Sequence, residues 1–150
     1  MSDPELGGLV TEFLLDVRPH IVDHSLRTYP QEAVGVLYDN PVGVYPLINQ
    51  KRSATEFWVS KVLVEDALTY LTSTERIPVA FYHSHPTKTA DPSPTDLELI
   101  KTMSGLSVIH GVDRIAAWMW SIEPSNGDGG VGRLVEVASV PLKPLETPNV

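Results

Sequence analysis

Cysteine is absent from this chain of 150 residues. Without thiols the protein can form no disulfide, iron–sulfur cluster, thiolate zinc site or cysteine nucleophile. Any metal site must therefore use histidine and carboxylate ligands, and the chain has 5 histidines. Basic residues are also few, since 11 Lys and Arg stand against 19 Asp and Glu, a formal net charge of −8. An acidic chain is a poor candidate for binding nucleic acid, which depends on neutralising phosphates.

Long apolar runs are missing as well. No stretch approaches the roughly 18 residues of a membrane span, and the acidic start Met1–Glu5 is unlike a secretory signal. These observations predict a soluble protein of the cytoplasm. The composition is that of a folded domain, with 42% hydrophobic and 20% charged residues. The length predicts a single domain over residues 1–150, with a proline-containing tail from about residue 143.

Apolar patterns predict helices and strands in alternation. Helices are expected from Pro19 to about Thr28, because proline suits a first helical turn, and over Val62–Leu71 and Pro94–Met103. Leu9–Val17 fits either a strand or the first turns of a helix. The expected strands are Ala33–Tyr38, Val44–Ile48, Glu56–Ser60, Pro78–Tyr82, Ser107–Val112, Arg114–Trp120 and Leu134–Leu142.

The connections complete the predicted fold. Four glycines in Ser125–Gly132 predict a flexible hairpin loop. The elements alternate without a repeated βαβ unit. The fold class is therefore α/β in the broad sense (α+β), a mixed β-sheet flanked by helices.

The segment from His83 to Asp96 carries the strongest chemical signal. Residues two apart on a strand point to the same side, so His83 and His85 project together from a strand end. Ser93 suits a helix N-cap and Pro94 the first helical position, which puts Asp96 in the first turn. From there Asp96 can reach back toward the histidines. Two imidazoles and one carboxylate are a ligand set that suits Zn²⁺ with an open fourth position.

A zinc site that hydrolyses a bond also needs a proton carrier. Glu32 is the candidate, because it comes directly before the buried strand Ala33–Tyr38. It would reach the site only if that strand neighbours the strand of the histidines. A simpler reading makes Ser93 and Asp96 a capping box alone and the histidines ordinary surface or core residues. That reading does not explain why all these features occur together.

The pattern Glu32 … His83-Ser84-His85-Pro86, six residues, then Ser93-x-x-Asp96 resembles the motif of the JAMM (MPN+) metallopeptidases. The segment from Tyr29 to Leu37 is similar to the family's first strand. The resemblance covers roughly Pro19 to Trp120. It implies a curved mixed sheet between helices, a sandwich like that of cytidine deaminases.

The resemblance also implies roles for residues. His83, His85 and Asp96 would be the ligands of one Zn²⁺, with a catalytic water as fourth ligand. Glu32 would be the general acid and base, and Ser93 would hydrogen-bond the water or the oxyanion. The family's reaction is hydrolysis of a peptide or isopeptide bond, often after the extended C-terminal tail of a ubiquitin-like protein.

The chain looks most like the compact prokaryotic and phage members of that family. One such group separates sulfur-carrier proteins from their cargo, and its members have a segment that resembles Asn49–Ser53. Another belongs to phage tail assembly, which would place the protein in a virion tail among tail proteins. Two hypotheses follow: an active zinc peptidase, or a tail-tip assembly component on the same fold.

Other residues were weighed for function. His20 and His24 are four apart, as in some metal sites, but two ordinary helix histidines are the favoured interpretation. His110 is expected to be a hydrogen-bonded strand residue. Trp118 and Trp120 should face the same side of a strand, and packing in the core or at an edge is favoured over an exposed aromatic patch for a partner protein. Trp58 could flank a substrate groove.

Overall fold

The computed structural model describes residues 4–102, 105–125 and 128–142. The predicted tail from about residue 143 lies outside these ranges. The elements follow in the order α1 (Pro4–Thr28), β1 (Val34–Asp39), β2 (Gly43–Leu47), α2 (Lys61–Ser73), β3 (Ile77–Ser84), α3 (Pro94–Thr102), β4 (Leu106–His110), β5 (Ile115–Ser125) and β6 (Asp128–Val140). Among the described helices, none is both long and apolar enough to cross a membrane.

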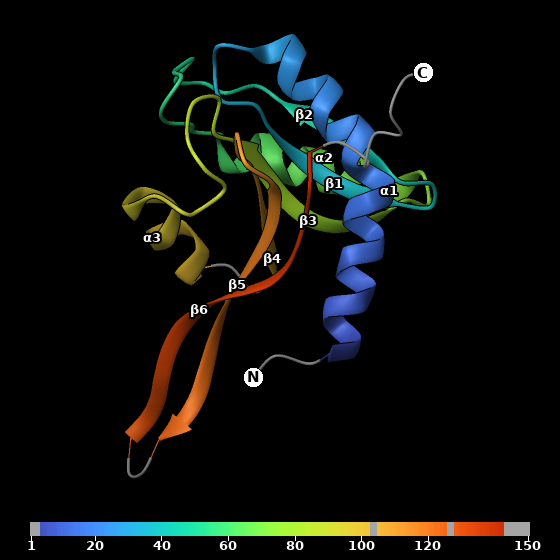
Figure 1. The fold of residues 1–150 in the computed structure, drawn as a ribbon. Coiled ribbons are helices and arrows are strands. Elements are labelled where there is room, and N and C mark those ends of the chain that lie inside the picture. Colours follow the sequence, from blue (N-terminus) through green and yellow to red (C-terminus); the bar gives the residue numbers. More distant parts are fainter. Residues whose placement is uncertain (1–3, 103–104, 126–127, 143–150) are drawn as a thin grey trace, which may run out of the picture.

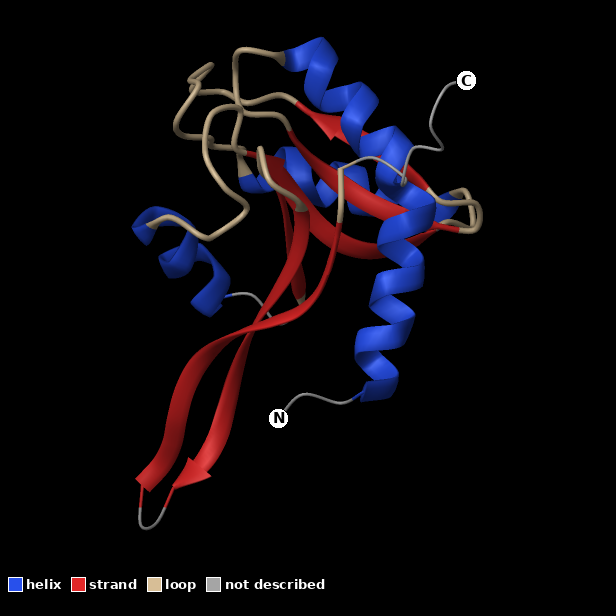
Figure 2. Cartoon of the chain, viewed as in Figure 1, coloured by secondary structure: helices blue, strands red, loops and turns tan. Residues whose placement is uncertain are grey.

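The six strands form one mixed sheet in the order β2-β1-β3-β4-β5-β6 (Figures 1 and 2). β3 and β4 run parallel, and the other neighbours are antiparallel. α1 packs on one face of this sheet, whereas α2 and α3 lie over the other. The prediction of a mixed sheet flanked by helices is confirmed.

α1 is longer than the sequence patterns predicted. Val10, Leu14, Val17 and Ile21 are spaced by four, three and four residues and form one buried stripe. Leu9–Val17 is therefore helical, and a helix start at Pro19 is wrong. Pro19 cannot donate to the carbonyl of Leu15, but both residues are exposed, so water can reach that carbonyl.

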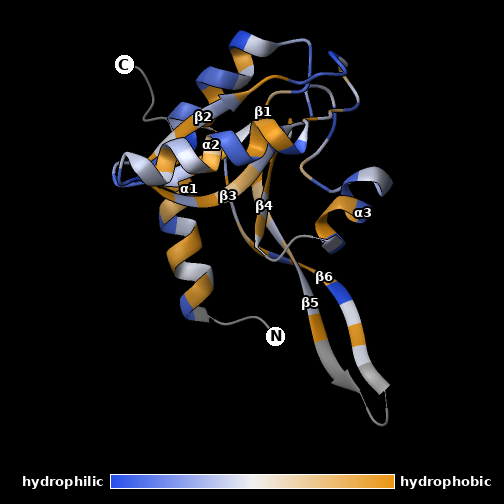
Figure 3. Ribbon diagram, turned by 180° about the vertical axis from the view of Figure 1, so that it is seen from behind, coloured by the Kyte–Doolittle hydropathy of each residue, from blue (hydrophilic) through white to orange (hydrophobic). Residues whose placement is uncertain are grey.

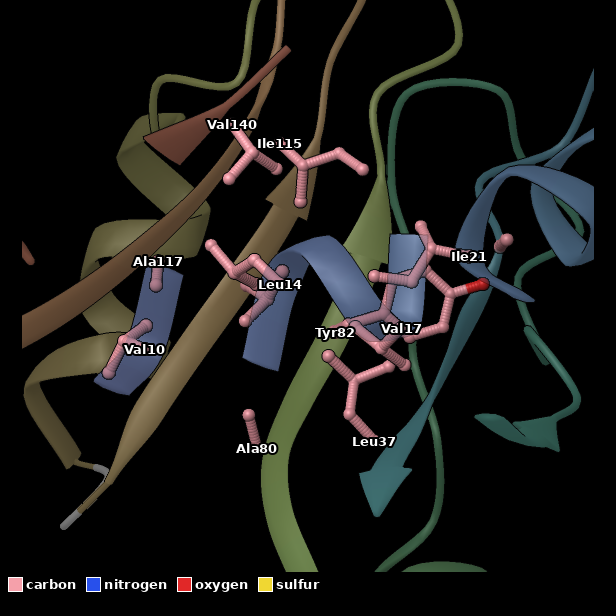
Figure 4. Packing of buried hydrophobic residues seen from close by; sticks show 12 residues of the cluster. Val10, Leu14, Val17, Ile21, Leu37, Ala80, Tyr82, Ile115, Ala117 and Val140 are labelled. Carbon is pink, nitrogen blue, oxygen red and sulfur yellow. The ribbon is translucent and has the colours of Figure 1, made fainter. Parts of the chain in front are cut away.

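The largest core cluster lies between α1 and the sheet (Figure 4). The α1 stripe packs there against Leu37 of β1, Ala80 and Tyr82 of β3, and Ile115 of β5. In Figure 3 the central strands β3 and β4 are largely hydrophobic in colour, whereas the loops beyond their ends are more hydrophilic. This core holds the strands in register and so fixes the strand ends that carry the polar residues.

The predicted strand Glu56–Ser60 does not form. The segment is irregular, and its backbone groups bond to the preceding turn instead of a neighbouring strand. Asn49 Oδ1 accepts from Trp58 N, and Gln50 Oε1 accepts from Ser60 N. Ser60 then caps α2 by accepting from Leu63 N at 3.3 Å, and that helix confirms the prediction for Val62–Leu71.

The flexible loop predicted over Ser125–Gly132 is also wrong for its described part. β5 and β6 pair as far as Ser125 opposite Asp128, and this hairpin projects from the body of the molecule (Figure 1). Gly132 lies beneath the ring of Trp120, where a side chain would not fit.

Candidate active site

Three ligand-type side chains converge at the end of β3. The Nε2 atoms of His83 and His85 are 3.2 Å apart. Asp96 Oδ2 lies 3.1 Å from the first and 2.8 Å from the second. All three side chains are buried. The structure therefore brings together the three residues that the sequence predicted as metal ligands.

Local structure explains this convergence. His83 lies in β3 on the face that α2 and α3 cover, and His85, two residues on, points the same way. Ser93 and Asp96 bond reciprocally at the start of α3: Asp96 N donates to Ser93 Oγ at 3.1 Å, and Ser93 N donates to Asp96 Oδ2 at 3.0 Å. The capping box is thus present, and it aims the carboxylate at the histidines.

Glu32 reaches the same place through strand pairing. β1 lies antiparallel to β3 with Val34 opposite His83, so the residue two positions before Val34 lies beside the strand end. Oxygen and nitrogen atoms of Glu32, His83 and His85 lie within 4.8 Å of one another. Glu32 is 3% exposed, and its Oε1 has no hydrogen-bond partner among the described residues. A buried carboxylate oxygen without a partner is rare and is typical of catalytic or ligand-binding sites.

Burial and charge shift the ionisation of these groups. Burial raises the pKa of Glu32 to about 7. Burial lowers the pKa of His83, whereas in His85 hydrogen bonds to Asp96 and Thr89 outweigh burial and raise the pKa. Burial would raise the pKa of Asp96, but the two histidines outweigh it and hold that pKa well below its usual range. The site therefore holds an ionised carboxylate and a second one that titrates near neutral pH.

The three convergent atoms fit a bound metal. His85 Nδ1 donates to the Thr89 carbonyl at 2.8 Å, so in the neutral ring Nε2 carries a lone pair. That lone pair faces the Asp96 oxygen and the His83 nitrogen, an arrangement that a cation between them would stabilise. Tetrahedral Zn²⁺ with ligands at roughly 2.0–2.1 Å places them about 3.3 Å apart. The observed spacings of 2.8–3.2 Å are close to that value.

Hydrogen bonds and ion pairs from β5 and the turn before it stabilise the loop between His85 and α3. Ala90 N donates to Asp113 Oδ1 at 2.8 Å, and Trp118 Nε1 donates to the Ala90 carbonyl at 2.9 Å. Arg114 forms ion pairs with Asp91, Asp113 and Glu136. These supporting residues could not be predicted from the sequence, because they depend on contacts between distant segments and leave no local pattern.

A cavity of about 390 Å³ opens beside the site. Its walls are mostly apolar, and they also include Ser93 and Asp96. Trp58 is 53% exposed and lines this cavity together with Phe57 and Phe81. The structure therefore places Trp58 where the sequence analysis expected it to flank a groove.

The remaining residues of interest lie elsewhere. His24 is buried and hydrogen-bonds the Tyr82 hydroxyl, whereas His20 is exposed on α1. His110 lies in β4 and bonds Ser25 at 2.8 Å, as predicted for a strand residue. Trp118 and Trp120 both join the cluster under α3, which confirms that they face one side and pack in the core.

Sequence comparison assigns the fold and the motif to one family. Residues 15–122 match the prokaryotic homologs of the JAB domain, which is most of the chain. The chain belongs to the prokaryotic JAB-domain family. The resemblance to compact prokaryotic members of the JAMM group is thereby confirmed.

Curated relatives lie in mycobacteria. The chain is 32% identical over 98 residues to proteins named CysO-cysteine peptidase from Mycobacterium bovis and from two strains of Mycobacterium tuberculosis. The alignment covers 59% of this chain and 67% of each relative.

A solved structure agrees with the fold. The solution structure of protein DSY2949 from Desulfitobacterium hafniense superimposes with a TM-score of 0.58 at 23% identity. The match covers 80% of this chain and 86% of that protein. At this identity the likeness concerns the fold alone.

Proposed function

We propose that this protein is a zinc-dependent peptidase that hydrolyses a peptide or isopeptide bond. The observation that carries the proposal is the convergence of His83 Nε2, His85 Nε2 and Asp96 Oδ2 to within 3.2 Å of one another beside the buried Glu32. The prokaryotic JAB family and the peptidase names of the mycobacterial relatives support it.

His83, His85 and Asp96 would hold the metal ion. When bound, zinc would supply Lewis-acid polarisation of the scissile carbonyl and a lowered pKa for water. The Thr89 carbonyl fixes the tautomer of His85, and the Ser93 backbone orients Asp96. These contacts leave Nε2 and Oδ2 as the donor atoms.

Glu32 would move the proton. Burial raises the pKa of Glu32 to about 7 in the metal-free protein, so its carboxylate is a stronger base than an exposed one and can take a proton from water and return it to the leaving amine. Its unpartnered Oε1 is the atom available for that transfer.

Ser93 would bind the oxygen on which negative charge develops. Its Oγ accepts from Asp96 N in the helix cap, which leaves the hydroxyl hydrogen free to donate. A donor at that point stabilises charge that appears in the transition state.

The proposed substrate is a ubiquitin-like or sulfur-carrier protein with an extended C-terminal tail. The name of the mycobacterial relatives supports a carrier-protein conjugate, and the mostly apolar cavity walled by Phe57, Trp58 and Phe81 supports a binding surface for a tail. Cytoplasmic location and a single domain over residues 1–150 stay predictions from the sequence. A role in phage tail assembly also stays a prediction, since no feature of the described residues favours it.

The test compares wild-type protein with Glu32→Gln, both loaded with zinc, on a sulfur-carrier conjugate, a ubiquitin-like isopeptide and a generic peptide. We expect Glu32→Gln to keep bound zinc and to lose at least 100-fold in kcat, because general acid–base catalysis contributes roughly that factor or more. Glu65→Gln is the matched control, since Glu65 is an exposed carboxylate of α2 that does not line the cavity.

Metal content provides a second, independent test of the proposal. His83→Ala should bind zinc less than wild type, measured by elemental analysis after dialysis. The proposal is wrong if wild type cleaves none of the three substrates faster than Glu32→Gln.

A further inference from the structure

Asn49 occupies an unusual place just after β2. It is 5% exposed, and both ends of its amide are used. Nδ2 donates to the carbonyls of Glu32, Glu56 and Ser53 at 3.1, 2.9 and 3.4 Å. A single buried side chain thus joins three separate points of the backbone.

The side-chain oxygen of Asn49 bonds to the irregular segment that follows it. Oδ1 accepts from Lys51 N at 3.0 Å and from Trp58 N at 3.3 Å. The segment from residue 50 to 58 is irregular, so the Asn49 amide supplies bonds that a neighbouring strand would otherwise provide.

The register of the sheet explains why Asn49 meets Glu32. β1 and β2 pair from Tyr38 opposite Gly43 to Val34 opposite Leu47. Continued by two residues, this register sets Glu32 opposite Asn49. The side-chain amide of Asn49 replaces the backbone ladder at that point, and Glu32 N donates to Ser53 O at 2.8 Å from the same turn.

On its other side Glu32 adjoins β3. The next residue, Ala33, donates to Ser84 Oγ at 2.8 Å and accepts from Ser84 N at 2.9 Å. The backbone before β1 is therefore held between the strand that carries His83 and the turn that Asn49 organises. Without the hydrogen bonds from the Asn49 turn, the Glu32 backbone can shift relative to His83 and His85.

We propose that Asn49 is a positioning residue, which holds the Glu32 backbone and the Trp58 wall of the cavity in one fixed geometry. The inference rests on the proposed role of Glu32 in hydrolysis. The hydrogen bonds of Asn49 in the described part of the chain go to backbone atoms and not to His83, His85 or Asp96, so its effect is on placement of the proton carrier and the substrate, and zinc binding should be unaffected.

The first measurement needs neither metal nor substrate. Backbone amide hydrogen exchange is followed by NMR in metal-free wild type and Asn49→Ala. We expect exchange at the Glu32 and Trp58 amides to rise at least tenfold, while amides within β3 stay unchanged. A uniform rise over β1 and β3 would mean general loosening and would overturn the positioning role.

The second measurement is steady-state kinetics of the zinc-loaded protein, normalised to bound zinc. Asn49→Ala should lower kcat by roughly 10- to 100-fold, the loss expected for a misplaced catalytic group, and raise KM through the Trp58 wall. Gln50→Ala is the matched control. It removes an amide of the same turn that bonds Ser60 and does not contact Glu32, so we expect wild-type kcat.

A second variant guards against failure of Asn49→Ala to fold. Asn49→Asp keeps the size and the oxygen that accepts from Lys51 N and Trp58 N but removes the donor to the carbonyls of Glu32, Ser53 and Glu56, so kcat should fall and KM should rise less than in Asn49→Ala. Wild-type exchange and wild-type kcat in a folded Asn49 variant would overturn this inference and leave the proposed function standing. A wild-type protein no faster than Glu32→Gln would overturn both.

Discussion

Substitution of Gly111 tests how close packing positions the loop between β3 and α3. A Cβ atom at this position would lie 2.2 Å from the Ala90 nitrogen and 2.4 Å from the Thr89 carbonyl carbon. These neighbours are backbone atoms and cannot rotate away. The backbone of Gly111 is itself tied by a bond from its nitrogen to the Arg114 carbonyl at 2.9 Å. Gly111→Ala must therefore displace the loop.

The size of the effect follows from those contacts. Ordinary contacts between heavy atoms lie at roughly 3.5–4.0 Å, so the loop must move by about 1 Å or more. Overpacking of this kind costs about 1–3 kcal/mol of unfolding free energy. The shift also moves the Thr89 carbonyl, which accepts from His85. If His85 is a zinc ligand as proposed, loss of such a supporting contact should weaken zinc binding by roughly 10- to 100-fold.

Two assays follow the two effects. Urea unfolding of the metal-free protein reports the free energy of unfolding, and competition with a chelator reports zinc affinity. Gly8→Ala is the control, because a Cβ there meets nothing within 4 Å and alanine suits a helix better by about 0.5–1 kcal/mol. If Gly111→Ala matched wild type in both assays, the argument from contacts would be refuted.

Three further predictions concern the fold around the site. Burial and the charge of Arg27 lower the pKa of His24, so the unfolded chain binds its proton more readily. The unfolding free energy of the metal-free protein should therefore fall as pH drops below about 6.5, and His24 should contribute at most about 1.4 kcal/mol per pH unit to that fall. Urea titrations of His24→Gln should show a shallower dependence of unfolding free energy on pH. Trp118→Phe loses the bond to the Ala90 carbonyl and should lower unfolding free energy by about 1–3 kcal/mol, whereas an equal midpoint would show that this bond contributes nothing. Arg114→Gln breaks a partly exposed ion-pair network, so we expect a loss of about 1 kcal/mol that shrinks at 1 M salt; a loss independent of salt would contradict an ionic origin.

Much of the architecture could be predicted from the chain because it depends on local periodicity. The period of two along β3 sets His83 and His85 on one face, and the Ser93 cap starts α3 where Asp96 can turn back. The errors share a cause. Pro19 and the glycines after Ser125 are local break signals that a continuous buried stripe and an antiparallel ladder overrode.

The prediction of a strand over Glu56–Ser60 was wrong for a different reason. Its residues favour a strand, but a strand needs a neighbour with free backbone groups. Here the amides of Asn49 and Gln50 take those bonds, and no local pattern records this.

The sequence by itself determined which chemistry is available. The lack of cysteine restricted any metal site to histidine and carboxylate, and the spacing from His83 to Asp96 indicated three candidate ligands. The sequence also named Glu32 as the candidate acid, but only the tertiary structure decided that it lies beside them. Glu32 lies 51 residues before His83 in the chain, and it reaches the site because β1 pairs antiparallel with β3 and Asn49 closes the end of that ladder. Pairing between distant strands depends on how the whole core packs, which short-range patterns do not contain.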